Sequence, residues 1–465
     1  MDDLRQVVTG TTIHKSFFHP RIKSVKYIIL GGGLAGITTA RLLHEHGHTA
    51  LVLEAETRAG GLCRSYTKDG FTFDLGGSHI VFSRNHDVLS FMHEMLADNR
   101  EERVRNTKIY YKDRYIKYPF ENGLNELPKE DCYFCLNEFI KILLADASSS
   151  TKTEPKNFQE WIYQTFGTGI AECYLKPYNE KIWKHPLTDI STHWVQGRVP
   201  RPPVEDIIKS AVGIETEGYT HQSLFSYPTT GGIEALIHAI AHPIKEQIIC
   251  DAPATDIQKT DTGWVVTAGG KTYTGDQLIS TIPLQNLVPC IHDLPDTISN
   301  AIDSLCYNSV ACIGIGIKGT VPPYSWAYIP DAKISKTHRI SFPSNFSLNC
   351  APNGHSSILA EITYKPGTAD EPQNDDTYIE KLIESLVNVG LFNREDVVTT
   401  AFMKNKFGYI VYDCAHEKNI SVIQTYFDEV GITLLGRFSE FEYYNMDDVI
   451  SSVMTYVNTT FNQLS

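Results

Sequence analysis

The chain has 465 residues, too many for a single hydrophobic core, and this length predicts two or three domains. The apolar fraction of 42% is that of an ordinary globular protein, and the formal net charge of −14 argues against a DNA or RNA backbone as the partner. No apolar run is long enough to span a membrane, and residues 1–24 lack the apolar segment of a secretory signal. We therefore expect a soluble, cytoplasmic protein with an N-terminal extension, whose scattered cysteines are ordinary thiols and bind no metal.

The first predicted elements form one βαβ unit. Residues 25–30 (VKYIIL) are a short apolar run that predicts a buried parallel strand, and a glycine-rich turn and a helical stretch follow it. Residues 48–54 (HTALVLE) predict the second strand. Such a unit is the building block of a parallel sheet covered by helices.

Helical patterns dominate the next part of the chain, from about 85 to 215. Residues 87–96 and 135–144 are examples, and the polar residues 148–153 predict a loop within this region. The region is therefore expected to form a separate helical unit.

Strand patterns dominate from about residue 245. Residues 262–284 predict a β-meander followed by a strand, and residues 309–317 alternate as a further strand. The acidic residues 365–377 predict a surface loop, and residues 446–461 predict a C-terminal helix.

The turn after the first strand carries the pattern GxGxxG in Gly31, Gly33 and Gly36. The first glycine permits a tight turn, the second lets the backbone approach a pyrophosphate, and the third packs the helix on the strand. The helix N-terminus then offers N–H groups and partial positive charge to phosphate. Glu54 ends the second strand, where a carboxylate can accept hydrogen bonds from a ribose, so the unit predicts a dinucleotide site.

The segment that follows resembles the second signature of a large family of FAD enzymes, which contains amine oxidases, protoporphyrinogen oxidases, carotene desaturases and UDP-galactopyranose mutases. It reads EAETRAGGLCRSYTKDGFTFDLGGSHIVFS, residues 54–83. The resemblance implies that its Arg-x-Gly-Gly element lies along the FAD pyrophosphate and that the glycines of DLGGSH admit the flat flavin ring against the backbone. The cofactor-binding residues that it implies here are Gly61, Arg64, Gly77, Ser78 and, at the adenine end, Ala254.

Four further segments resemble one branch of this family, the UDP-galactopyranose mutases and related sugar-nucleotide mutases. They are residues 118–130, 160–199 with its PYNEKIW core, 326–347 and 434–450. In these mutases N5 of the reduced FAD attacks the anomeric carbon of the sugar, the nucleoside diphosphate leaves, and it returns after the ring has changed size. The resemblance implies an isomerase that makes a furanose, such as galactofuranose, from a nucleoside-diphosphate sugar. It also implies FAD active in its reduced form and a reductant such as NAD(P)H.

The resemblance assigns roles to individual residues of this chain. Arg198 and Arg339 are expected to bind the diphosphate, because guanidinium groups are permanently charged and bidentate. Tyr409 and Tyr443 are expected to donate hydroxyl hydrogen bonds to it, and His79 is expected beside the flavin. The residues expected to line the nucleotide and sugar cleft are Tyr118, Glu121, Trp326 and Tyr328. Those expected to hold the flavin from the C-terminal side are Gly436, Arg437, Asn445 and Met446.

Two positions depart from the mutase pattern. Phe346 stands where that pattern has a tyrosine near the diphosphate, so one hydroxyl is missing. Glu121 stands where it has a glutamine facing uracil. A carboxylate only accepts hydrogen bonds, which suits a base with adjacent N–H donors such as guanine.

Other functions are open at this point. An oxidase or desaturase of the same family would need an apolar or aromatic channel and would have no use for two cleft arginines. A flavin-binding relative without activity is a third reading, which the two departures support.

The predicted fold class is α/β, a Rossmann-type FAD-binding domain with an inserted helical domain and an antiparallel sheet domain. The FAD-binding domain is expected at 25–84, 216–299 and 406–465, the helical cap at 85–215 and the sheet domain at 300–405. The helical cap is a candidate lid, since such chemistry must exclude water.

Overall fold

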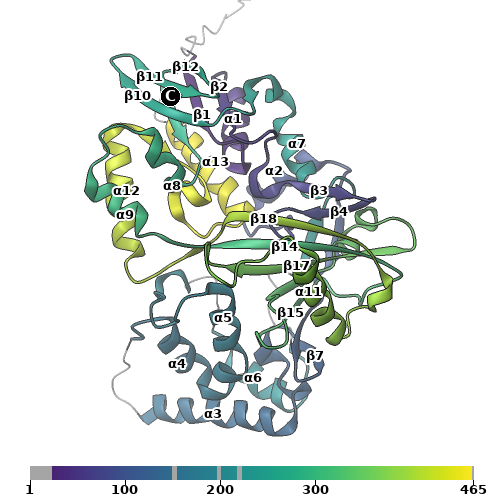
Figure 1. Cartoon of the computed structure of the whole chain (residues 1–465). Helices are drawn as coiled ribbons and strands as arrows, with labels where there is room; N and C mark the ends of the chain where they lie inside the picture. Colours follow the sequence, from purple (N-terminus) through teal and green to yellow (C-terminus); the bar gives the residue numbers. More distant parts are fainter. Residues whose placement is uncertain (1–23, 149–153, 196–200, 217–222, 463–465) are drawn as a thin grey trace, which may run out of the picture.

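A five-stranded parallel sheet contains the predicted βαβ unit (Figure 1). The structure is a computed structural model that describes residues 24–148, 154–195, 201–216 and 223–462. The strand order is β19 (Ile432–Leu434), β13 (Gln277–Ser280), β1 (Lys26–Leu30), β2 (Thr49–Leu53) and β9 (Ile248–Ile249). Helix α1 (Leu34–Glu45) connects β1 to β2, so this prediction is confirmed. The predicted extension before the first strand lies almost wholly outside the described residues.

Apolar side chains cover both faces of the parallel sheet. On one face α1 packs with α2 (His86–Leu96), α7 (Glu234–Ala241) and α13 (Met446–Asn462) around Ile29 and Val52. On the other face Ile28 and Leu278 share a core with the antiparallel meander β10 (Ala254–Thr260), β11 (Gly263–Ala268) and β12 (Lys271–Gly275). The meander and the C-terminal helix are where the sequence predicts them.

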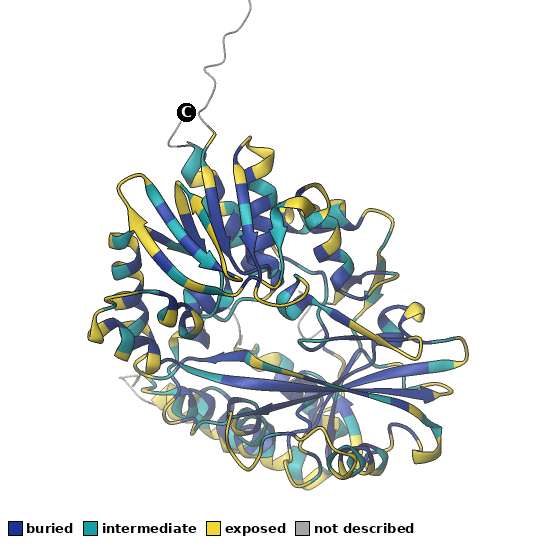
Figure 2. Ribbon diagram, turned by 45° about the horizontal axis from the view of Figure 1, so that its top comes forward, coloured by how far each residue is buried: buried dark blue, intermediate teal, exposed yellow. Residues whose placement is uncertain are grey.

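A second, seven-stranded sheet crosses the middle of the molecule, and most of its strands are buried (Figure 2). Its order is β18 (Val397–Val411), β14 (Cys306–Lys318), β17 (His355–Tyr364), β16 (Arg339–Ser341), β15 (Trp326–Tyr328), β6 (Thr107–Tyr111) and β7 (Arg114–Lys117). All neighbours are antiparallel except β15 and β6, which are parallel. With the parallel sheet, this sheet confirms the predicted α/β fold class.

The two faces of this sheet differ because side chains alternate along a strand. Ile313, Ile340 and Ala360 point to the face covered by α11 (Asp376–Asn388), which begins inside the predicted surface loop. The opposite face receives β4 (Phe71–Asp74), whose Phe73 lies directly on Gly314. A methyl group on Gly314 would come within 2.6 Å of that ring, so this close approach needs glycine. This second face carries the candidate site.

Several helices lie on the side of the seven-stranded sheet that faces away from the parallel sheet (Figure 1). They are α3 (Lys129–Ser148), α4 (Phe158–Ile170), α5 (Lys176–Trp183) and α6 (Val204–Ala211). The region expected to be helical also contains strands. Strand β5 (Glu101–Val104) pairs with β8 (Leu224–Tyr227), and β6 and β7 extend the large sheet. The division into three domains stays a proposal.

Helix α5 is joined to the large sheet by buried hydrogen bonds. The Lys181 ammonium donates to the carbonyls of Ile329 at 2.6 Å and Thr337 at 2.7 Å. In return Asn308 of β14 donates to the carbonyl of Ile182 at 3.0 Å, and Thr363 of β17 donates to that of Lys181 at 3.1 Å. The C-terminal end of α5 is therefore part of the floor of the site.

Within the described ranges, no helix combines the length and the apolar character that crossing a membrane requires.

Candidate functional site

The turn after β1 is shaped by glycines with different surroundings. Gly31 has a φ of +98°, and a Cβ there would lie 2.7 Å from Thr281 Oγ1. A Cβ on Gly36 would lie 2.0 Å from the Gly31 carbonyl oxygen. A Cβ on Gly33 would meet only the Cα of Gly61, at 4.0 Å. Two of the glycines are thus required by packing, whereas Gly33 faces open space at the N-terminus of α1.

Glu54 is buried at the end of β2, and backbone groups fix its carboxylate. Its Oε2 accepts the Gly32 N–H at 2.6 Å and its Oε1 accepts the Glu56 N–H at 2.9 Å. The Glu54 carbonyl accepts the N–H of Ala252 at 2.8 Å, which brings Ala254 at the start of β10 close to this site. Carboxylate lone pairs that remain can accept ribose hydroxyls.

The second glycine-rich segment lies beside the first. The Gly60 N–H donates to the Gly32 carbonyl at 2.7 Å, and Arg64 Nε donates to the Gly61 carbonyl at 3.1 Å. Arg58 instead pairs with the buried Glu234, a partner that sequence reasoning missed. The structure therefore places Gly61 and Arg64 next to the predicted phosphate turn.

The C-terminal segment reaches the same place. Gly436 has a φ of +90°, and a Cβ there would lie 2.6 Å from the Cβ of Ala35 in the first turn of α1. Met446 begins α13 and is buried, and the Asn445 N–H donates to the Asp448 carboxylate at 2.9 Å. Gly436 thus lies against the first turn of α1, and Met446 packs in the core to which α1 contributes.

The segment after β4 lies against the seven-stranded sheet. Gly77 has a φ of +92°, and a Cβ there would lie 2.7 Å from Glu361 Oε2 in β17. Ser78 Oγ is 2.5 Å from Ser341 Oγ in β16. The His79 Nδ1 is buried and has no hydrogen-bond partner among the described residues. Burial, with the nearby charges of Arg339 and Arg437, lowers the pKa of His79 to about 4, so its ring is neutral at pH 7.

A buried ion pair lies under this segment. Arg339 of β16 donates from Nε and Nη2 to the two oxygens of Glu361, at 2.9 and 2.6 Å, and from Nη2 to Tyr409 at 3.3 Å. Arg339 and Glu361 are cross-strand partners in the register of β16 and β17. The Glu361 side chain is 0% exposed and the Arg339 side chain 25%. Burial raises the pKa of Tyr409, so its phenol remains a donor.

Arg437 and Tyr443 complete this cluster. The Arg437 guanidinium lies 4.8 Å from the ring centre of Tyr443 and 5.5 Å from that of Tyr409. The two tyrosine rings are stacked at 6.1 Å. Arg437 Nη2 donates to the Gly408 carbonyl at 2.8 Å, while its buried Nε has no partner in the described part of the chain. Two guanidinium groups and two phenols, all predicted site residues, are therefore brought together.

An aromatic group lies next to Arg339 on the same face of the sheet. Tyr328, the cross-strand partner of Arg339, contacts Tyr118 at 5.3 Å and Tyr178 at 5.4 Å between ring centres. Arg105 lies over the rings of Tyr118 and Trp326, at 5.1 and 5.3 Å. Glu121 is buried in the short helical turn that follows Tyr118.

Phe346, one of the two departures from the mutase pattern, is buried beside Trp326. Phe346 is fully buried and packs against Trp326 at 5.0 Å and Phe225 at 5.3 Å between ring centres. Its ring is thus part of an apolar core. The indole Nε1 of Trp326 is buried without a hydrogen-bond partner among the described residues.

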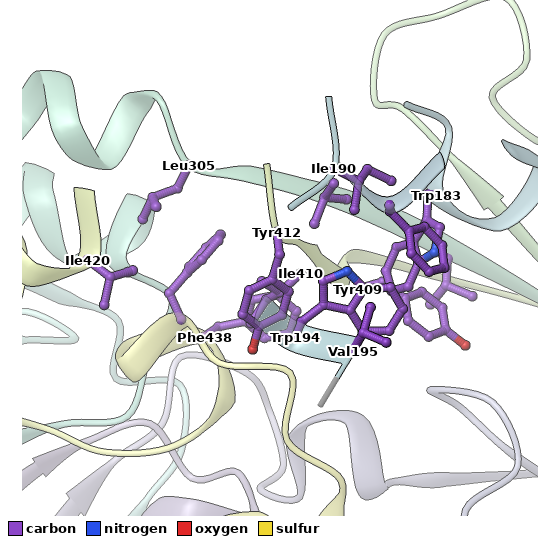
Figure 3. Packing of buried hydrophobic residues seen from close by; sticks show 14 of the residues in the cluster. Trp183, Ile190, Trp194, Val195, Leu305, Tyr409, Ile410, Tyr412, Ile420 and Phe438 are labelled. Atoms are coloured by element: carbon purple, nitrogen blue, oxygen red, sulfur yellow. The ribbon is translucent and has the colours of Figure 1, made fainter. Parts of the chain in front are cut away.

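Arg198 lies outside the described residues, so its expected role stays a proposal. The chain before it packs in an aromatic core, where Trp194 contacts Trp183 at 5.2 Å and Phe158 at 5.0 Å (Figure 3). Trp183 also contacts Tyr443 at 5.8 Å. These tryptophans therefore have a packing role, at the edge of the candidate site.

Sequence reasoning missed Glu361, Arg105 and Tyr178. Glu361 has a recognisable signal, because it is a lone carboxylate within the otherwise apolar run ILAEI of a strand. A charge at such a position is rare unless it is paired. Tyr178 lies within the PYNEKIW core, so the motif marks its segment but not the rings that it contacts. Arg105 has no comparable signal, since its neighbours come from distant parts of the chain.

The comparisons with known proteins agree on the fold and differ on the reaction. A family profile described as flavin containing amine oxidoreductase matches residues 34–413. A crystal structure of reduced UDP-galactopyranose mutase superimposes with a TM-score of 0.86 at 28% identity, covering 95% of this chain and 96% of that one. A UDP-galactopyranose mutase of Mycoplasma pneumoniae is 23% identical over 224 residues, 47% of this chain and 53% of that protein. A putative L-amino-acid oxidase of Bacillus subtilis is 24% identical over 359 residues, 72% of each chain. This chain therefore spans about half the length of the curated mutase that it matches.

Proposed function

Since this chain belongs to the family of flavin-containing amine oxidoreductases, we propose that it is an FAD-dependent isomerase that interconverts the pyranose and furanose forms of a nucleoside-diphosphate sugar. The observation that carries this proposal is the cluster of Arg339, Arg437, Tyr409 and Tyr443 beside the Gly77 segment. The fixed guanidinium of Arg339 and the two phenols suit a diphosphate, whose charge grows when the bond to the sugar breaks, and Arg437 beside them is expected to face the flavin. The likeness to the reduced mutase over 95% of the chain supports it.

The described residues fit FAD at both ends. Gly33 leaves open space at the N-terminus of α1, which suits a pyrophosphate, and Glu54 is placed for a ribose. At the other end, the buried Nδ1 of His79 and Nε of Arg437 lack partners among the described residues, and a ligand with polar edges could satisfy them. When bound in its reduced form, the flavin supplies a nucleophile for the anomeric carbon.

The residues of the chain bind and orient the substrate. Arg339, and by proposal Arg198, bind the diphosphate and keep it near when it leaves. Tyr409 and Tyr443 donate hydrogen bonds to it, while Tyr118, Tyr328 and Trp326 line the cleft for nucleoside and sugar. The paired Glu361 fixes the fork of Arg339 in one orientation.

An amine or amino-acid oxidase is the alternative, and the match to the Bacillus subtilis protein over 72% of both chains favours it. Such a reaction changes the oxidation state of the flavin and needs no group for a departing diphosphate. The two functions thus differ in two ways. The oxidase reaction has a net change in the oxidation state of the substrate and the isomerase reaction has none, and only the isomerase needs Arg339 to bind a departing diphosphate.

The test is anaerobic incubation of the dithionite-reduced protein with UDP-, GDP- and dTDP-sugars, followed by chromatography for a furanose isomer. We expect an isomer only with the reduced flavin, with the oxidised protein as the matched control. If no sugar is converted while oxygen is consumed with amines or amino acids, the oxidase is the correct function.

Glu121 leads to a proposal for the base. Its buried carboxylate accepts hydrogen bonds only, so it suits the N–H donors of guanine better than uracil. We expect the wild type to bind GDP more tightly than UDP and the variant Glu121→Gln to shift the preference toward UDP. Equilibrium titration followed by flavin absorbance measures both. A wild type that binds UDP tightly and GDP not at all would contradict this choice of base.

A further inference from the structure

Tyr412 follows β18 and lies at the junction of three parts of the chain (Figure 3). Its ring is buried between two histidines, with ring centres 5.0 Å from His193 and 4.3 Å from His416. His193 belongs to the segment between α5 and α6, and His416 begins α12 (His416–Val430).

The Tyr412 hydroxyl makes two short hydrogen bonds to neighbouring residues. It donates to Glu442 Oε2 at 2.5 Å and accepts the backbone N–H of Tyr443 at 2.6 Å. A phenol can donate and accept at once, and the carboxylate strengthens the donated bond. The main chain of Tyr443 is thereby fixed to the end of β18.

The main chain of Tyr412 fixes a second segment. Its carbonyl accepts the Ser191 N–H at 2.8 Å, Ile190 forms a bridge with Asp413, and the Cys414 N–H donates to the Asp189 carbonyl at 3.1 Å. The segment then continues to Trp194, which packs on Trp183. Tyr412 therefore joins the sheet, the segment before Arg198 and the C-terminal segment.

The position of the Tyr443 ring depends on this arrangement. That ring lies between Tyr409, Trp183 and Arg437, at 6.1, 5.8 and 4.8 Å. These contacts join rings to each other or to a guanidinium, and they depend only weakly on the exact position of the ring. The hydrogen bond from the N–H of Tyr443 to the Tyr412 hydroxyl, at 2.6 Å, adds a directional restraint on the main chain.

We propose that Tyr412 is a positioning residue, whose hydroxyl holds the main chain of Tyr443 so that the Tyr443 phenol meets the diphosphate of the substrate. This inference rests on the proposed function. The positioning of Tyr443 is assigned to the hydroxyl oxygen of Tyr412, because that oxygen accepts the Tyr443 N–H, whereas the ring of Tyr412 packs between the two histidines.

The first test is the variant Tyr412→Phe, which keeps the ring and removes the hydroxyl. We expect the dissociation constant for the preferred nucleoside diphosphate to rise roughly tenfold, as for the loss of one buried hydrogen bond. KM for the nucleotide sugar should rise with it, while flavin content stays that of the wild type. Tyr426→Phe is the matched control, because the Tyr426 hydroxyl makes no hydrogen bond within the described part of the chain.

A double-mutant cycle separates positioning from general stabilisation. If Tyr412 acts through Tyr443, the double variant Tyr412→Phe/Tyr443→Phe binds no more weakly than Tyr443→Phe alone. Additive losses, wild-type affinity in Tyr412→Phe, or a Tyr412→Phe protein that cannot be purified with flavin would each overturn the inference. A wild type that binds no nucleoside diphosphate would overturn the proposed function itself, and the wild-type titration alone decides that.

Discussion

At the scale of single residues, the two members of the ion pair between Arg339 and Glu361 differ in burial. The carboxylate is wholly buried, whereas the guanidinium keeps some contact with solvent. Arg339→Met leaves a buried charge without a partner and should lower the free energy of unfolding by about 3–5 kcal/mol. Glu361→Gln keeps an acceptor oxygen and leaves the solvent-accessible cation, so we expect a loss of only about 1–2 kcal/mol. Urea denaturation measures both.

The surface pair of Arg394 and Glu380 provides the control. Both of its side chains are nearly half exposed, and Arg394→Met should change stability by less than about 1 kcal/mol. Equal decreases in the free energy of unfolding for Arg339→Met and Glu361→Gln would contradict this prediction, because they would show that the greater burial of the carboxylate has no energetic consequence.

Asp74 makes stability depend on pH. Burial raises its pKa to about 6, although Ile233, Ser65 and Tyr227 donate hydrogen bonds to it. Because the folded-state pKa lies above the unfolded value of 3.8, the folded protein binds an extra proton between about pH 4 and 6. The stability from this proton is present at low pH and is lost as the pH rises through 6. Relative to Asp74→Asn, the wild type should lose at most about 1.4 kcal/mol per pH unit over this range.

His79 should act in the opposite direction. Its pKa falls from 6.5 to about 4 on folding, so its contribution is present above pH 6.5 and is lost as the pH falls. Denaturation curves at several pH values between 4 and 7 give the free energy of unfolding of the wild type minus that of each variant. As the pH rises, this difference should fall for Asp74→Asn and rise for His79→Gln. A difference that stays constant over this range for either variant means that the residue does not titrate with a shifted pKa.

At the scale of elements, the turn between β1 and α1 separates packing from ligand binding. Gly33 has a φ of −76°, and a methyl group there meets open space, so Gly33→Ala should change the stability of the apoprotein by less than about 0.5 kcal/mol. The same change at Gly36 drives a methyl into the Gly31 carbonyl and should cost about 1–3 kcal/mol. Of these two positions, Gly33 is the one with space for a pyrophosphate, so Gly33→Ala should weaken flavin binding at least tenfold.

Flavin absorbance and denaturation of the apoprotein check this pair of variants. Normal flavin content in Gly33→Ala would show that the pyrophosphate does not bind at this turn, whatever the behaviour of Gly36→Ala.

Helix α5 limits how the helical region can move. Its C-terminal end shares buried hydrogen bonds with Asn308, Thr363 and the loop around Thr337. Hydrogen exchange should therefore be slower in α5 than in α6, whose Val204 and Ile208 are exposed. Lys181→Met should speed exchange in α5 and in residues 329–337 and leave α6 unchanged. Equal exchange in wild-type α5 and α6 would support a lid that moves as one body.

At the scale of the whole molecule, what could be predicted from sequence was what is local in the chain. The βαβ unit has its turn, helix and both strands within about thirty residues, and local patterns suffice for it. Strand β6 is different, because its partner β15 lies more than 200 residues away, and no pattern near Thr107 announces that pairing. The region from 85 to 215 therefore reads as helical although it donates two strands to the large sheet.

The same distinction applies to the candidate site. Arg339, Tyr409 and Tyr443 could be named from the family resemblance, and the structure brings them together. The partner of Arg339 could not be named, because the register of β16 and β17 decides which residue opposes it. Which role each residue has toward the substrate is a proposal that the experiments above address.

The buried tryptophans give the molecule an optical reporter of its own. Trp183 contacts Tyr443, and Trp326 lies beside Arg105. Indole emission overlaps flavin absorption, so bound flavin should quench both rings by energy transfer. Occupancy of the site can therefore be followed by intrinsic fluorescence, without attaching a dye to the chain.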